Sequence, residues 1–335
     1  MAGAPHGGAE AFYERLSLAL HAAGEEVLPV IRRDAERAAR LSAGGLHPVE
    51  LAFGGAFDLA TGPRLRRVLA AFAPAVVIAW MNRAARFTPR GPWTVVGRLG
   101  GYYDLKYYRR CDHLVGNTRD ITRWIVAQGW PAERAHHLPN FVADLAGAAP
   151  AALPGAPPRL LAMGRLHRNK GFDVAIRALA LLPGAHLAIA GEGPERAALA
   201  ALAREAGVAE RVAFLGWRSD VGALLAAADV FVCSSRHEPL GNIVLEAWSA
   251  ARPVVAAAAE GPRELIADGE TGLLVPPDAP EALAAAIGAL LADPARAARL
   301  AAAGRALYAR DFAEAAVLAR WRAFLAALAP ARRAA

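Results

Sequence analysis

Residues 229 to 246 read Asp229-Val-Phe-Val-Cys-Ser-Ser-Arg-His-Glu-Pro-Leu-Gly-Asn-Ile-Val-Leu-Glu246. The first seven residues have the apolar, β-branched pattern of a short buried strand. Pro239 biases Glu238 toward an extended conformation, and Gly241 permits a sharp turn. Asn242 is expected to cap a helix, which places Glu246 about one turn inside it. The stretch therefore predicts a strand, a polar turn and a helix.

The two glutamates of this stretch, Glu238 and Glu246, are expected at one edge of a sheet. Open α/β folds bind ligands in the crevice beyond the carboxyl ends of their strands. Carboxylates at that place can accept hydrogen bonds from paired sugar hydroxyls. Taken alone, the pattern fits a capped surface helix with two unrelated glutamates equally well.

The second half of the chain begins with another predicted strand, and the turn after it reads Gly164-Arg165-Leu-His-Arg-Asn-Lys170-Gly171. Backbone N–H groups and the helix dipole favour an anion at such a strand-to-helix turn. Arg165 and Lys170 would add two cations, which suit a diphosphate and the charge that develops on a leaving group. An arginine-rich chain also forms solvated basic loops, but only two of the 38 basic residues are lysines, Lys106 and Lys170.

The composition is that of a well-buried globular protein. The chain has 335 residues, of which 55% are hydrophobic and 21% charged, so two domains are expected. We find no apolar run long enough to span a membrane and no signal-peptide pattern, and the two cysteines have no metal or redox spacing. We therefore expect a reduced, cytoplasmic setting. The net charge of +7 comes almost wholly from arginine and requires no nucleic-acid partner.

Strand-like and helix-like segments alternate in both halves of the chain. The alternation predicts an α/β protein with two doubly wound domains that face a central cleft. The expected strands cover 26–31, 75–79, 94–96, 113–116, 159–163, 186–190, 212–215, 230–233 and 253–256. The expected domains are 1–145, a linker at 146–158 rich in Ala, Pro and Gly, 159–305, and a helical segment 306–335 that returns to the first domain. The segment 298–329 is strongly helical and could pack back across the first half.

The beginning of the sequence is unusual for such a fold. His6-Gly7-Gly8-Ala9-Glu10 runs directly into an amphipathic helix over 11–23. A glycine turn that opens a helix normally follows a strand, yet only five residues precede this one. We expect the first strand of the N-terminal domain to be missing from this sequence.

The basic turn and the paired carboxylates together fit a nucleotide-sugar site, and the chain resembles a known family at these residues. It is similar to the retaining nucleotide-sugar glycosyltransferases of family 4 (group 1), which have the two-domain GT-B fold. The resemblance covers nearly the whole length. Its motifs are Gly164-Arg165 with Lys170-Gly171, Gly191-Glu-Gly193-Pro194, Phe214-Leu-Gly216, the Glu238 to Glu246 signature, Gly261 with Glu264, Asp268-Gly-Glu-Thr-Gly-Leu-Leu-Val-Pro276, Gly7-Gly8 and Leu138-Pro139-Asn140.

This resemblance implies roles for particular residues. Arg165 and Lys170 would bind the donor diphosphate and help it depart, and Glu238 would hold hydroxyls of the donor sugar; these three are the expected catalytic residues. Glu246 would accept hydrogen bonds from the ribose, and the loop at Gly216-Trp217 would lie near the base. The expected donor-binding set is Gly7, Gly8, Gly164, Arg165, Lys170, Trp217, Glu238, Leu240, Gly241, Asn242 and Glu246, with Gly7 and Gly8 approaching from the N-terminal, acceptor-binding domain.

The resemblance also implies a reaction. Such enzymes need no metal or cofactor and retain the anomeric configuration, with a donor phosphate oxygen taking the acceptor proton. The expected donor is a UDP- or GDP-hexose, and the expected acceptor is a cell-envelope glycan or glycolipid such as lipopolysaccharide. Many members carry a histidine after a central strand of the first domain, where this chain has Gly100. Asn82 and Arg83 are alternatives, and the proton acceptor of that domain stays unassigned.

The segment from Tyr102 to Arg110 is the most aromatic and basic of the first half. It holds four of the six tyrosines and, as a helix, would place Tyr103 and Tyr107 on one face. With the arginines upstream it suits a membrane interface or an anionic saccharide, although a partly buried helix with snorkelling arginines fits equally well. The expected acceptor residues are Asn82, Arg83, Arg98 and Tyr103, and the segment would allow a peripheral contact at the inner face of a membrane.

Two other functions remain open from the sequence. One is a sugar-nucleotide epimerase on the same fold, and the other is a catalytically weak nucleotide-sugar-binding partner subunit. An NAD-dependent oxidoreductase is disfavoured because Gly191-Glu-Gly193-Pro-Glu-Arg196 ends in arginine where the dinucleotide motif needs glycine. A pyridoxal enzyme would need a Schiff-base lysine, and Lys170 is the only lysine of the second half.

Overall fold

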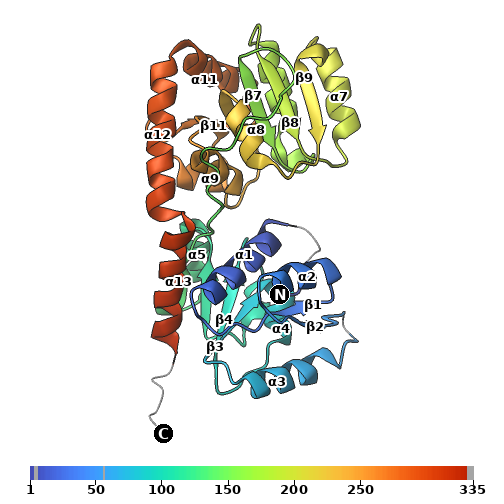
Figure 1. Ribbon diagram of the computed structural model, residues 1–335, viewed down its shortest axis with the longest axis vertical. Coiled ribbons are helices and arrows are strands. Elements are labelled where there is room, and N and C mark those ends of the chain that lie inside the picture. Colours follow the sequence, from blue (N-terminus) through green and yellow to red (C-terminus); the bar gives the residue numbers. More distant parts are fainter. Residues whose placement is uncertain (4–6, 56, 330–335) are drawn as a thin grey trace. The chain divides into compact units, whose positions relative to one another are not determined.

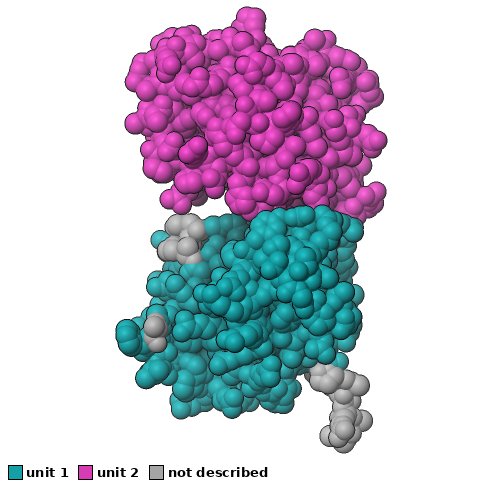
Figure 2. Space-filling model, turned by 180° about the vertical axis from the view of Figure 1, so that it is seen from behind, with its two compact units in different colours: residues 1–140, 314–335 teal, residues 141–313 magenta. Residues whose placement is uncertain are grey.

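The computed structural model describes residues 1–3, 7–55 and 57–329, which form two compact units (Figures 1 and 2). Unit 1 comprises residues 1–140 and 314–335, and unit 2 comprises residues 141–313. Both units alternate strands with helices and contain only parallel strand pairs within their sheets. The prediction of two doubly wound α/β domains is therefore confirmed.

Unit 2 is built on one six-stranded parallel sheet with the strand order β12-β11-β10-β7-β8-β9. Its elements are β7 (Arg159–Met163), η3 (Arg168–Lys170), α6 (Phe172–Ala180), β8 (His186–Ala190), α7 (Arg196–Glu205), η4 (Ala209–Arg211), β9 (Val212–Gly216), α8 (Val221–Ala227), β10 (Val230–Cys233), α9 (Asn242–Ser249), β11 (Val254–Ala257), α10 (Glu260–Leu265), β12 (Leu273–Val275), α11 (Pro280–Ala292) and α12 (Pro294–Asp311).

Both faces of this sheet are covered, which explains its continuous apolar strands. Because side chains of a strand alternate between faces, Leu160 and Ala162 of β7 pack into one apolar cluster, and Leu161 and Met163 pack into the other. The four residues of β10 divide between the two clusters in the same way. β7 and β10 are consequently the rigid centre of unit 2.

Unit 1 contains two separate parallel sheets, of order β1-β2 and β3-β4-β5-β6. Its elements are α1 (Gly8–Ala22), β1 (Val30–Arg32), α2 (Ala35–Ala43), β2 (Val49–Leu51), α3 (Thr61–Phe72), β3 (Val76–Trp80), α4 (Met81–Phe87), β4 (Thr94–Leu99), η1 (Leu105–Tyr108), β5 (His113–Gly116), α5 (Arg119–Ala127), η2 (Ala132–Arg134), β6 (Ala135–His137) and α13 (Glu314–Leu328). The C-terminal helix α13 belongs to this unit and buries Val317 and Trp321 in it.

Parts of the chain form other elements than the sequence suggests. The helical segment expected over 298–329 is present as two helices, α12 and α13, because the chain leaves helical geometry at Phe312 and Ala313, whose N–H groups both donate to the Tyr308 carbonyl at 2.8 Å. The helix considered for Tyr102 to Arg110 does not form, because only the four-residue 3₁₀ turn η1 lies there. The expected linker at 146–158 packs on unit 2, where Leu153 is buried in the core.

Candidate functional site

The strand order of unit 2 reverses between its two central strands. From β7 the chain proceeds outward through β8 to β9, and then returns to place β10 on the other side of β7. The loops after β7 and β10 therefore leave the same edge of the sheet, at the switch point where open α/β folds bind ligands. The basic turn follows β7 and the Glu238 to Glu246 stretch follows β10, so the two predicted motifs meet at this switch point.

Glycines allow the backbones of three loops to approach one another at this edge. The Gly164 N–H donates to the Ala190 carbonyl at 2.9 Å, and the Gly191 N–H donates to the Gly216 carbonyl at 2.7 Å. A Cβ atom on Gly191 would lie 1.9 Å from the Gly164 carbonyl oxygen, so glycine is required there. The motifs at Gly164, Gly191 and Gly216 thus form one contiguous wall.

The turn that ends with Lys170 packs directly on the loop after β10. Gly171 has a φ of 59° and caps helix α6, and a Cβ atom on it would lie 2.1 Å from the Ser234 carbonyl oxygen. The Ser234 hydroxyl donates to the Lys170 carbonyl at 3.0 Å. These contacts hold the Lys170 side chain beside the loop that carries Glu238.

Lys170 and Glu238 form an ion pair across the switch point. Their side chains keep 23% and 12% of their exposure, so the pair is largely shielded from water but remains accessible. One carboxylate oxygen of Glu238 accepts from Lys170, and the other accepts from the Gly241 N–H at 3.2 Å. Lys170 and Glu238, two of the catalytic residues predicted from the sequence, are therefore direct partners.

Arg236 is a structural clamp of this site that the sequence analysis missed. Its guanidinium makes two parallel hydrogen bonds to Asp173 on α6, at 2.7 and 2.6 Å, and donates to the Arg168 carbonyl at 2.9 Å. Its Nε atom donates to Asp278 at 2.5 Å. The hydrogen bonds to Asp173 raise the pKa of Arg236 above its usual value. The only advance signal was its position two residues before Glu238 in an arginine-rich chain.

A second missed pair supports Glu238 from the other side. The ring Nδ1 of His237 lies 2.9 Å from Oε1 of Glu260, and the Glu238 N–H donates to the other Glu260 oxygen at 3.2 Å. The Gly261 N–H donates to the Glu238 carbonyl at 2.7 Å. The start of α10 therefore fixes the backbone of Glu238, and the resemblance motif at Gly261 pointed to this place without naming Glu260.

Helix α9 begins at Asn242, but the predicted cap is wrong. Gly241, with a φ of 84°, is the N-cap residue, and no side chain caps the helix. The left-handed Gly241 directs its N–H to Glu238, and its carbonyl accepts from the Val244 N–H at 2.9 Å. Glu246 lies at the fifth position of α9 and is half-buried, and Leu240 is buried.

Two of the predicted donor-binding residues lie at the surface of unit 2. Trp217 follows the positive-φ residue Gly216 at the end of β9 and is 71% exposed. Arg165, next to Gly164, is also exposed. An exposed indole and an exposed guanidinium at a carboxyl strand edge are free of core packing and can contact a ligand.

The predicted residues of unit 1 lie at several places in that unit. Gly7 and Gly8 are exposed at the start of α1, and a Cβ atom on Gly7 would lie 2.3 Å from a carboxylate oxygen of Glu10. The Asn82 side chain, which follows β3 on α4, accepts from the Tyr108 hydroxyl at 2.9 Å. Arg83 is exposed, Tyr103 is half-buried, and Gly100 follows the end of β4.

Arg98 is not part of a basic surface. It is fully buried in β4, with its guanidinium 4.8 Å from the Trp80 ring and 5.3 Å from the Phe12 ring, and it donates to the Asn140 side chain. Burial lowers the pKa of Arg98 to about 10. Among the described residues, its Nε and Nη1 atoms have no hydrogen-bond partner. The expected exposure of this arginine was wrong because its planar face packs between aromatic rings.

The charges of the Tyr102 to Arg110 segment are partly neutralised locally. Lys106 pairs with Asp104 at 2.6 Å, and the hydrogen bond that it donates to Asp104 raises the pKa of Lys106. Tyr102 donates to Asp120 on α5 and packs edge-on against Trp124. The positive surface of the Tyr102 to Arg110 segment is therefore smaller than the sequence predicts.

Within residues 1–3, 7–55 and 57–329, no group of three or more His, Cys, Asp and Glu side chains is arranged to hold a metal ion. Over the same ranges, no helix combines the length and the apolar character needed to cross a membrane.

Known proteins resemble this chain over nearly its whole length. Residues 157–293 match the family model described as Glycosyl transferases group 1. LpsE of Rhizobium meliloti, a lipopolysaccharide core biosynthesis glycosyltransferase, is 36% identical over 325 residues that cover 93% of each chain. LpsD of the same organism, with the same description, is 36% identical over 328 residues that cover 93% of this chain and 92% of LpsD. The crystal structure of Anabaena HepE in complex with UDP is 21% identical and covers 97% of this chain and 98% of HepE, with a TM-score of 0.84.

Proposed function

Because the chain belongs to the group 1 glycosyl transferases and has their GT-B fold, we propose that it transfers a hexose from a UDP- or GDP-sugar to a cell-envelope glycan or glycolipid, such as the core of lipopolysaccharide. The family, the fold and the glycosyltransferase activity confirm the expectations from the sequence. We propose four further points: the donor, the acceptor, retention of the anomeric configuration and independence of a metal ion.

One observation carries the proposal, the ion pair between Lys170 and Glu238 at the switch point of unit 2. The ammonium stands one residue before Gly171, the N-cap of α6, where the helix dipole also favours an anion. The carboxylate stands three residues before Gly241, the N-cap of α9. A cation for a diphosphate and an acceptor for sugar hydroxyls are thus side by side, as the two halves of a nucleotide sugar require.

The proposed reaction exchanges one bond at the anomeric carbon of the donor. The bond from this carbon to the diphosphate oxygen breaks, and its electron pair leaves with the diphosphate, where Lys170 and Arg165 stabilise the added charge. An acceptor hydroxyl forms the new bond on the same face, and its proton passes to a phosphate oxygen of the leaving group. Glu238 holds the transferred sugar, Glu246 the ribose, and the loop at Trp217 the base.

The relatives support the choice of substrates. LpsE and LpsD are described as enzymes of lipopolysaccharide core biosynthesis, and their similarity covers nearly the whole of this chain. HepE has been crystallised with UDP, which favours a uridine donor among the two candidates. For this chain, the envelope acceptor and the UDP-sugar follow from these likenesses as proposals.

The test begins with the donor. A panel of UDP-, GDP- and ADP-sugars is screened by thermal shift, since a ligand that binds the folded state raises its apparent stability. The donor found is then incubated with lipopolysaccharide core acceptors, and the product is analysed by mass spectrometry and by NMR of the new anomeric linkage. Transfer with retention that survives a chelator supports the proposal. An inverted linkage, or loss of activity with the chelator, overturns the corresponding part.

The same experiment separates the two alternative functions. A new sugar nucleotide formed without an acceptor would identify an epimerase. Tight donor binding without transfer to any acceptor would identify a binding partner subunit. The roles of Gly7, Gly8, Asn82, Arg83 and Tyr103, the peripheral membrane contact and the cytoplasmic location remain predictions of the proposed function.

A further inference from the structure

The positive charge of the chain is concentrated in one segment of unit 1. Apart from the buried Arg98, residues 57–110 contain nine basic residues and only two acidic ones, Asp58 and Asp104. This surplus of seven equals the net charge of +7 of the whole chain, so the rest of the chain is close to neutral. All nine basic side chains are exposed.

The exposed arginines of this segment come from three neighbouring parts of the fold. Helix α4 packs against α3 (Figure 1) and against η1. The Arg66 guanidinium on α3 donates to the Arg90 carbonyl at 3.4 Å, and the Arg90 guanidinium donates to the Arg109 carbonyl at 3.2 Å. In the same way, Arg110 donates to the Arg86 carbonyl at 3.3 Å. These arginines therefore lie next to one another, and we call the exposed arginines of the segment the basic face.

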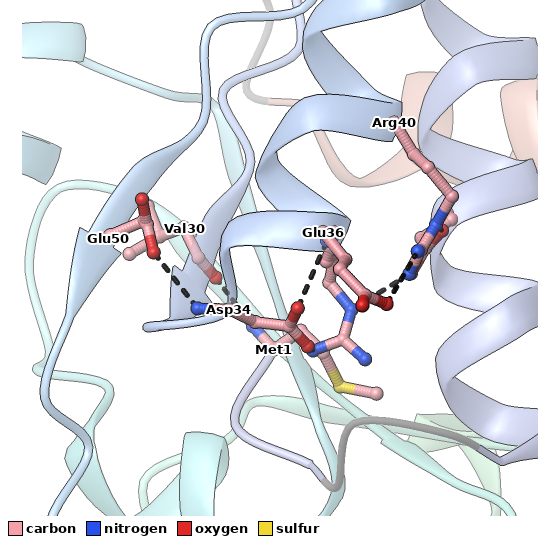
Figure 3. A network of polar contacts seen from close by, with 8 residues as sticks. Met1, Val30, Asp34, Glu36, Arg40 and Glu50 are labelled. Atoms are coloured by element: carbon pink, nitrogen blue, oxygen red, sulfur yellow. Dashed lines mark hydrogen bonds and ion pairs between the residues drawn. The ribbon is translucent and has the colours of Figure 1, made fainter.

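Carboxylates do not balance the arginines of the basic face. In α2, by comparison, Arg40 donates to Glu14 at 2.8 Å, and its Nη1 atom lies 3.7 Å from a carboxylate oxygen of Glu36 (Figure 3). Asp104 of the segment pairs with Lys106. Among the described residues, no ion pair joins a carboxylate to an arginine of the basic face. Like charges held this close repel one another, so the face is suited to an external anionic partner.

Two apolar side chains lie beside the basic face. Phe57 and Leu59 are 97% and 84% exposed, the highest values among the large apolar side chains of the described residues. They belong to the loop between β2 and α3. Arg83 of the basic face donates to the Phe53 carbonyl of this loop at 3.4 Å. The apolar and the basic side chains therefore form one continuous surface of unit 1.

The loop directs Phe57 and Leu59 outward because the residue between them is bound to the loop. The Asp58 carboxylate accepts from the Gly54 N–H at 2.6 Å and from the Thr61 hydroxyl at 2.6 Å. A single exposed apolar side chain is ordinary on a protein surface. Two of them on a loop that is fixed by hydrogen bonds are available to enter an apolar phase.

An anionic bilayer matches both parts of this surface. Its headgroups attract clusters of basic residues, and its interfacial region takes up apolar side chains. An anionic saccharide would neutralise the arginines but would leave Phe57 and Leu59 in water. The combination of the two features therefore favours a lipid surface.

We propose that unit 1 docks on an anionic lipid bilayer through the basic face, with Phe57 and Leu59 inserted into the interfacial region. The contact expected at Tyr102 to Arg110 is then only one edge of a larger surface. The inference supplies a surface for the membrane contact that the proposed function includes. It is measured as binding without donor or acceptor, so it can fail while the transferase activity stands.

Co-sedimentation of the full chain with lipid vesicles tests the charge. We expect binding to phosphatidylcholine vesicles that contain about 30% phosphatidylglycerol, little binding to pure phosphatidylcholine, and release at about 0.5 M salt. Replacing Arg64, Arg67 and Arg86 together by glutamine should weaken binding about 100-fold, because each basic residue near an anionic surface strengthens binding about fivefold. These side chains are exposed, so the variant should keep the wild-type Tm.

A matched control removes the same charge from unit 2. Arg177, Arg204 and Arg299 are exposed on helices of that unit, and their joint replacement by glutamine should weaken binding less than threefold. Equal losses from both triple variants would show that only net charge matters and would overturn the proposal.

A fluorescent label tests the insertion. Phe57→Cys can be labelled selectively with NBD, because the native Cys111 and Cys233 are buried. Its emission should rise severalfold with the anionic vesicles, whereas NBD on Leu181→Cys, an exposed position of unit 2, should not respond. Replacing Phe57 and Leu59 together by serine should weaken binding at least about tenfold.

Three other results would overturn the proposal. The first is absence of wild-type binding to the anionic vesicles. The second is binding without a rise in NBD emission at Phe57, which rejects the insertion. The third is binding of soluble dextran sulfate that depends on Arg64, Arg67 and Arg86 while vesicles are not bound, which assigns the basic face to a saccharide.

Discussion

Replacing Lys170 by methionine removes one charge of the switch-point ion pair and keeps most of the aliphatic stem. The carboxylate of Glu238 would remain, with the Gly241 N–H 3.2 Å away as a neutral partner. Since the Glu238 side chain is only 12% exposed, water can compensate this charge only in part. The variant is therefore expected to lose both stability and turnover, for two separable reasons.

The two losses have different expected sizes. Breaking a fully buried ion pair from one side costs about 3–5 kcal/mol. Because 23% of the Lys170 side chain still reaches solvent, we expect about 2 kcal/mol here, or a drop in Tm of about 4–8 °C. Loss of one electrostatic stabiliser of the departing diphosphate is expected to lower kcat by about 10²–10³-fold, which corresponds to about 3–4 kcal/mol.

A double variant separates stability from chemistry. Lys170→Met with Glu238→Gln removes both charges, so most of the lost stability should return while turnover stays low. Arg310→Met is the matched control, because Arg310 is 72% exposed and pairs with its neighbour Asp311 at the surface of the same unit. It is expected to change stability by less than about 1 kcal/mol and to leave turnover intact. Calorimetry and initial rates with the identified donor measure both quantities.

Either measurement can refute the reasoning. If Lys170→Met kept the wild-type kcat, the diphosphate role of the ammonium would be wrong. If the single and the double variant melted at the same temperature, the carboxylate of Glu238 would not be the source of the instability. Equal damage from Arg310→Met would show that any loss of a cation has this effect.

Three further perturbations test other parts of the structure. Arg236→Lys keeps the charge but loses the two parallel hydrogen bonds to Asp173, so the donor KM should rise in steady-state kinetics, and an unchanged KM would contradict the clamp. Gly171→Ala would bring a Cβ atom 2.1 Å from a carbonyl oxygen and should lower the free energy of unfolding in urea by about 2–5 kcal/mol. The control Gly184→Ala should cost about 1 kcal/mol, because Gly184 also has a positive φ but open space around it. Equal losses would refute the packing argument. The Met1 ammonium has a pKa of about 5 in the folded chain, against a reference value of 8.0. Between pH 5 and pH 8 the unfolded chain therefore binds more protons than the folded chain. The free energy of unfolding should rise with pH over this range, by up to about 4 kcal/mol. The comparison of Tm at pH 5 and pH 8 must include a chain whose Met1 amine is acetylated, because partly buried histidines such as His137 contribute with the same sign. An equal rise in both chains would exclude Met1 as the source.

Five of the six strands of unit 2 could be predicted from the sequence, most clearly β7 and β10, which are almost wholly buried, whereas β12 was not predicted. Segments such as 159–163 and 230–233 are short apolar runs between turn residues, and the structure confirms both sets of bounds. The turn residues also identified the motifs at Gly164 and Gly241 correctly. Local composition is sufficient where burial and turn chemistry agree.

The pairing of distant segments could not be predicted in this way. β7 and β10 are neighbours although about 70 residues separate them, and nothing in either segment specifies the other. The Arg236 clamp depends on Asp173, which lies on helix α6, and on Asp278, which lies in the loop after β12. The cap of α9 was assigned to Asn242 because propensity favours it, whereas the helix begins one residue earlier than that assignment requires, with Gly241 as its N-cap. Tertiary geometry decided these points.

The division of the chain into units has a consequence for its synthesis on the ribosome. Unit 2 is a continuous segment from Phe141 to Ala313 and can fold as soon as it has emerged. Unit 1 cannot finish until α13 is released, because Trp321 of that helix is fully buried in it and the Leu328 carbonyl accepts from Thr94. At ~5–20 residues per second, the first 140 residues wait about 9–38 s for their last helix. The half of the protein that is made first is therefore completed last, and truncation after residue 313 should leave unit 2 folded and unit 1 open.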